Sequence, residues 1–81
     1  MQDRIARALA ARLEELADVG ERVGAHAPSF LRLHEAASVA TTNAVALDLL
    51  PAARARAIWR DAADRHPVLY EAPRPRLRDA A

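Results

Sequence analysis

The chain has 81 residues, which is enough for one domain. Hydrophobic residues make up 52% of it, but 21 of them are alanine, and the aromatic residues are Phe30, Trp59 and Tyr70. Because alanine buries little area, the composition excludes a multidomain enzyme and a deep cavity walled by large side chains. The lack of cysteine excludes disulfides, thiolate zinc sites, iron–sulfur clusters and a cysteine nucleophile.

Charge is nearly balanced, with 12 basic residues, all arginine, against 11 acidic ones and a net charge of +1. No segment has the strong basic excess of a dedicated nucleic-acid binder. The sequence contains no apolar run near 18 residues, so we expect no membrane association. Acidic residues begin at Asp3, which is unlike a secretory signal, and we expect a cytoplasmic protein.

Residues 3–23 form the first predicted helix. Apolar side chains recur there at alternating steps of three and four residues, as they do on one face of a helix. Gly20 and Gly24 weaken the end of this segment, and Gly24 is a suitable stop.

Residues 28–50 form the second predicted helix, which begins at Pro28 because proline suits a first helical turn. A stripe with large residues at both ends and alanine between them runs along it. The alanines allow another helix to approach closely, so we predict an oligomer seam in which three- and four-residue steps alternate. Its members are Phe30, Leu33, Ala37, Ala40, Ala44 and Leu47.

Pro51 and Pro67 delimit a third, short helix over residues 51–66. The sequence therefore predicts a helical domain over 1–66 and an extended, Pro/Arg-rich C-terminal tail over 67–81. Trp59 is expected to supply the largest single piece of core area, and an exposed anchor for a partner is the alternative interpretation. Thr41, Thr42 and Asn43, in the second helix, are poor helix formers that mark a local distortion or a polar contact.

The tail combines apolar anchors, a stiff proline-containing spacer and arginines that bind carboxylates in a bidentate manner. It predicts docking of a partner protein through Val68, Leu69, Tyr70, Arg74 and Arg76. An idle, frayed terminus is the alternative interpretation.

A basic cluster in the third helix, formed by Arg54, Arg56 and Arg60, is a possible anion contact. A solvated arginine face is the favoured interpretation of these residues.

Local catalytic and metal-binding motifs are missing from the sequence. His26, His34 and His66 lie far apart, so we expect surface or helix-end histidines and no metal site. Ser29 and Ser38 lack the sequence context of a serine nucleophile, and no glycine-rich phosphate loop is present. We therefore assign no catalytic residue and no cofactor.

One family resemblance rests on two segments. Residues 9–12, Leu-Ala-Ala-Arg, followed by Val19-Gly20, look like the start of the small all-helical chorismate mutases, and residues 50–59 are similar to the entry of that family's last helix. The resemblance implies that Arg12 meets a substrate carboxylate. The chain departs from the family in having no lysine and in carrying Pro67 where the last helix would continue.

These observations predict an all-α fold, a helical hairpin plus a short third helix, assembled into an oligomeric bundle, most simply a dimer. The predicted function is a non-enzymatic oligomerisation and protein-interaction module, such as an adaptor, an antitoxin-like inhibitor or a regulatory subunit. Two alternatives stay open: a small DNA-binding regulator that uses the arginine cluster, and a small helical enzyme with a site between subunits.

Overall fold

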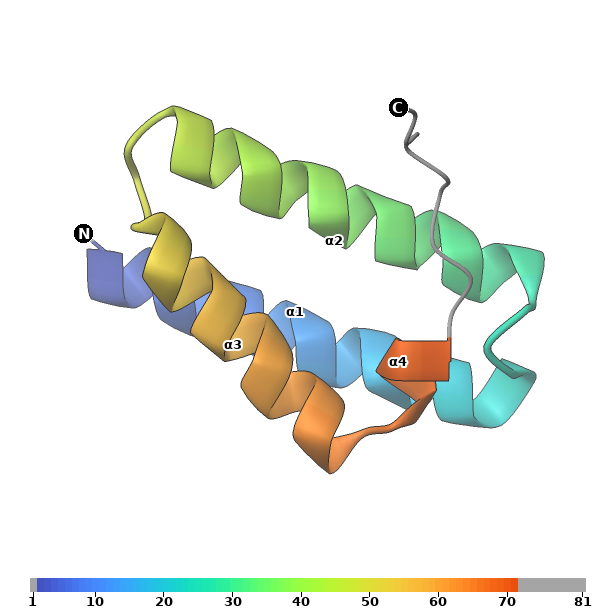
Figure 1. Cartoon of the computed structure of the whole chain (residues 1–81). Coiled ribbons are helices and arrows are strands. Elements are labelled where there is room, and N and C mark those ends of the chain that lie inside the picture. Colours follow the sequence, from blue (N-terminus) through green and yellow to red (C-terminus); the bar gives the residue numbers. More distant parts are fainter. Residues whose placement is uncertain (1, 72–81) are drawn as a thin grey trace, which may run out of the picture.

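The computed structural model describes residues 2–71, which form four helices and no strand. In chain order they are α1 (Gln2–Val23), α2 (Pro28–Ala46), α3 (Ala52–Arg65) and α4 (Val68–Glu71). Both α2 and α3 pack along α1, and they contact each other far less (Figure 1). The predicted all-helical fold, with a hairpin and a short third helix, is confirmed. Each helix in this part of the chain is too short or too polar to cross a membrane.

The helix ends follow from glycine and proline. Gly24 takes a φ of 97°, a left-handed conformation that ends α1 without strain, and its N–H donates to the carbonyl of Gly20 over 2.8 Å. Pro28 opens α2, and Pro51 caps the start of α3 in an extended conformation.

The second helix ends at Ala46, four residues before its predicted end. Asp48 adopts a φ of 64°, and the N–H groups of Asp48 and Leu49 donate to the carbonyls of Val45 and Ala44. This is a Schellman motif in which aspartate takes the place usually held by glycine. Leu50 then turns inward and becomes almost completely buried.

The core is built around Phe30 and Leu13, both fully buried, with Leu16, Leu69 and several alanines filling the rest. Trp59, expected to supply the largest piece of core area, is only partly buried against this core. Gly20 makes this packing possible, because a Cβ at that position would lie 2.6 Å from Cε1 of Phe30. The absence of a side chain therefore lets the aromatic ring of α2 rest directly on the backbone of α1.

The prediction of extended chain from residue 67 is wrong for its first residues. Pro67 does end α3, but Val68–Glu71 form α4, and the N–H of Leu69 donates to the carbonyl of His66. Leu69 is 4% exposed and belongs to the main core. The helical turn forms because it buries this leucine against α1.

Candidate functional site

The outer face of α2 is exposed, largely apolar, and free of charge from residue 36 onward. Residues 36–47 contain no charged side chain, and Leu33, Val39 and Leu47 are 46%, 51% and 68% exposed. One stripe of exposed residues advances by alternating three and four positions, the spacing that coiled-coil helices use to meet a partner. We call it the α2 face, and it consists of Leu33, Ala36, Ala40, Asn43 and Leu47.

A shallow groove of about 170 Å³ between α1 and α2 adjoins this face. Ile5 and Leu9 of α1 and the exposed Ala40 of α2 line it, so the groove and the α2 face form one continuous surface. Arg12 is the one charged residue in its lining, and it makes no ion pair with any described residue. A convergence of arginines, which the enzyme hypothesis requires, is not found here within the described chain.

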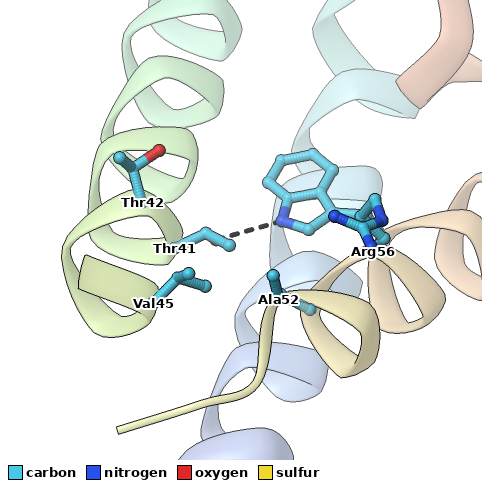
Figure 2. A pocket seen from close by; sticks show the side chains of 7 residues that line it. Thr41, Thr42, Val45, Ala52 and Arg56 are labelled. Atoms are coloured by element: carbon cyan, nitrogen blue, oxygen red, sulfur yellow. Dashed lines mark hydrogen bonds between the residues drawn. The ribbon is translucent and has the colours of Figure 1, made fainter. Parts of the chain in front are cut away.

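A larger pocket of about 290 Å³ opens between α2 and α3, on another side of α2 (Figure 2). Thr42 and Val45 line it from α2, and Ala52 and Arg56 line it from α3.

Two of the polar side chains that line this pocket, Thr41 and Trp59, are connected by a hydrogen bond. The indole N–H of Trp59 donates to Thr41 Oγ1 over 3.0 Å, and the same hydroxyl donates to the carbonyl of Ala37 over 2.8 Å. His34 lies against the indole ring edge-on, with 5.4 Å between ring centroids. Trp59 is thus the main link between α2 and α3, which agrees with the polar contact considered for Thr41.

Ion pairs join α1 to the α3–α4 corner. His66 Nε2 lies 2.9 Å from one oxygen of Glu14, and His66 Nδ1 lies 3.4 Å from Glu21. Arg65 pairs with Glu14 and, over 3.0 Å, with Asp61. His66 immediately precedes Pro67 and α4, so these contacts hold the corner that carries Leu69 against α1.

These contacts shift three pKa values, and each shift favours the charged form of the side chain. The hydrogen bonds from His66 and Arg65 lower the pKa of the Glu14 carboxyl. The hydrogen bond with Glu14 raises the pKa of His66, and it also raises that of Arg65. Both ring nitrogens of His66 face carboxylates, an arrangement that only the doubly protonated imidazolium satisfies.

The structure divides the predicted oligomer seam into two parts. Phe30 and Ala37 are buried in the chain's own core, and Ala44 is partly buried. Leu33, Ala40 and Leu47 remain exposed and belong to the α2 face. The stripe therefore faces two ways, inward at one edge and toward solvent at the other.

The arginine cluster is also divided. Arg54 pairs with Asp3 of α1 over 3.0 Å, whereas Arg56 lines the α2–α3 pocket and Arg60 is exposed outside it. The three side chains consequently have different surroundings, and nothing in this arrangement favours phosphate contact over a solvated face.

The five predicted docking residues do not form one exposed surface within the described part of the chain. Leu69 occupies the core and is not available as an anchor, and Val68 is partly buried beside it. Tyr70 belongs to α4 by its backbone, and Arg74 and Arg76 lie outside the described residues. Docking through the tail beyond α4 stays a prediction.

Sequence reasoning missed the Glu14–His66 contact and the α2–α3 pocket. Both are formed by residues far apart in the chain, and no local spacing signals them. Among the described residues, no three acidic, histidine or cysteine side chains are arranged to hold a metal ion. Comparisons with protein-family models, curated proteins and solved structures found no match to this chain.

Proposed function

We propose that the chain is a non-enzymatic helical interaction module that self-associates through the α2 face into a symmetric dimer. The observation that carries this proposal is the exposed, uncharged stripe of α2, with Leu47 68% exposed at one end and Leu33 46% exposed at the other. A largely apolar helix face that no other described helix covers is typical of a surface that a partner buries.

A second copy of the chain suits this surface for two reasons. The stripe is self-complementary, because its small central residues, Ala36 and Ala40, leave room for an equivalent helix to approach closely while the terminal leucines pack around it. The absence of charge from residue 36 to residue 47 means that these stretches of two α2 helices meet without electrostatic repulsion or desolvation of ions, and Arg12 is the charged residue that lines the neighbouring groove.

The resulting assembly pairs two α1–α2 hairpins into a four-helix bundle. Ile5 and Leu9, in the groove beside the α2 face, lie where side chains of the second copy would be buried. Because the interface is apolar, the dimer should persist as salt rises, whereas an arginine-dependent DNA complex would weaken steeply.

Light scattering on a sizing column, combined with a matched pair of variants, tests this proposal. Ala40→Glu places a charge in the centre of the α2 face, and Ala57→Glu places the same charge on an exposed position of α3. We expect a dimer, twice 8.8 kDa, for the wild type and for Ala57→Glu, and a monomer for Ala40→Glu.

Circular dichroism of both variants checks that the helices are retained. A wild type that stays monomeric as its concentration is raised refutes the proposal, and so does an Ala40→Glu protein that dimerises as well as Ala57→Glu does.

A further inference from the structure

The α2–α3 pocket has the features of a binding site for a small molecule. Its volume of about 290 Å³ is close to the lower limit of ligand pockets, and its walls include the apolar side chains of Val45, Ala52 and Ala55. Since one water molecule takes up about 30 Å³ in the liquid, the pocket has the volume of about ten water molecules, which is enough for a single small ring with one polar substituent.

The charged group at the pocket is a single cation without a counterion. Arg56 is exposed, lines the pocket, and makes no ion pair with any described residue. A guanidinium group presents paired N–H donors that match a carboxylate in a bidentate geometry. Among the described residues, no acidic side chain contributes to the lining, which favours an anionic ligand there.

The N-terminus of α3 adds positive electrostatic potential beside the pocket. Ala52, the first residue of α3, lines the pocket, and the N-cap residue Pro51 supplies no side-chain hydrogen bond to the first turn. The free N–H groups of that turn carry the positive end of the helix dipole, which favours a negative charge nearby.

The remaining polar groups leave the interior of the pocket suited to an apolar body. The indole N–H of Trp59 is already bonded to Thr41, so neither group needs a ligand atom, and the exposed hydroxyl of Thr42 is the one side-chain hydroxyl of the lining left to bond water or a ligand. The indole ring itself is a flat apolar surface of the kind on which an aromatic ring packs.

We propose that the α2–α3 pocket binds a small apolar carboxylate, with the carboxylate at Arg56 and the apolar body between Val45 and Trp59. This site lies on another side of α2 from the α2 face, and Thr41 separates it from the α1–α2 groove. Thr42 lines the pocket and Ala40 belongs to the α2 face, and two residues separated by two positions point to different sides of a helix.

Benzoate is a suitable probe because it has nine non-hydrogen atoms, and benzamide has the same shape without the charge. Trp59 is the only tryptophan, so its indole N–H gives one assignable signal in a ¹H–¹⁵N NMR spectrum. We expect benzoate to shift this signal saturably and benzamide to bind at least tenfold more weakly.

A matched pair of arginine variants tests the role of the cation. Arg56→Gln should weaken benzoate binding at least tenfold, whereas Arg60→Gln, on the same helix but outside the pocket, should leave it unchanged. The spectrum of each variant, recorded before benzoate is added, shows whether the fold is intact.

Three results would overturn the proposal: no saturable shift of the Trp59 signal, equal affinity for benzamide, or equal weakening by the two substitutions. The dimer measurement does not depend on any of these outcomes, so failure of one proposal leaves the other standing.

Discussion

Gly20→Ala should destabilise the protein even though alanine is the better helix former. Gly20 lies inside α1, where replacing glycine by alanine gains about 1 kcal/mol of helix propensity. The new Cβ would lie 2.6 Å from Cε1 and 2.9 Å from Cδ1 of Phe30, and this ring is fully buried. Overpacking of a filled core costs about 1–3 kcal/mol, which exceeds or cancels the propensity gain.

Urea denaturation followed by circular dichroism, at one fixed protein concentration, measures the effect. We expect Gly20→Ala to lower the free energy of unfolding by about 1 kcal/mol, which corresponds to about 4–8 °C in melting temperature for a domain of this size. Ala11→Gly, at an exposed position of α1, is the control for propensity alone and should cost about 1 kcal/mol.

A double-mutant cycle locates the clash. Phe30→Leu removes the atoms that the new Cβ would meet, so it should be less harmful in the Gly20→Ala background than in the wild type. If Gly20→Ala instead raises the free energy of unfolding by about 1 kcal/mol, the full gain in helix propensity, the close packing of Phe30 on α1 is refuted.

Three further predictions concern single contacts. The pKa of His66 is raised above its ordinary value of 6.5 in the folded protein, so the stability that its contact with Glu14 provides is complete below pH 6.5 and is lost as pH rises through the raised pKa. The urea midpoint should therefore fall over this range for the wild type and change less for His66→Gln. Thr41→Val leaves the Trp59 N–H without its acceptor and should cost about 1 kcal/mol, whereas Thr41→Ser should not, and equal urea midpoints would contradict the contact. Asp48→Ala should cost about 1 kcal/mol because alanine tolerates a φ of 64° poorly, and Asp48→Gly should be harmless; thermal melts compare the two.

The fold was predictable wherever a single residue forces the backbone. Gly24, Pro51 and Pro67 delimit the helices in the sequence and in the structure. The early end of α2 was not predicted, because aspartate takes the left-handed conformation only where the surrounding packing favours it. The helical turn around Leu69 escaped prediction for the same reason, since only the tertiary core supplies its stabilisation.

The candidate site was predictable in part. The apolar periodicity of the second helix predicted one stripe, but only Leu33, Ala40 and Leu47 of that stripe are exposed, and its role as an oligomer seam stays a prediction. Alanine suits both a buried and an exposed position, so the two edges of the stripe could not be assigned from the sequence. Phe30 and Ala37 face the core, and Leu33 and Leu47 face solvent. The contact between Glu14 and His66 joins residues 52 positions apart and has no local signature.

Site-specific crosslinking tests the central claim most directly, because the chain has no cysteine of its own. In a symmetric dimer through the α2 face, Ala40, midway between Leu33 and Leu47, faces Ala40 of the second copy. Mild oxidation of dilute Ala40→Cys protein should therefore give a covalent dimer, whereas Ala57→Cys, on α3, should remain monomeric on a denaturing gel. Equal crosslinking of the two variants, or none at Ala40→Cys, would contradict self-association through this face.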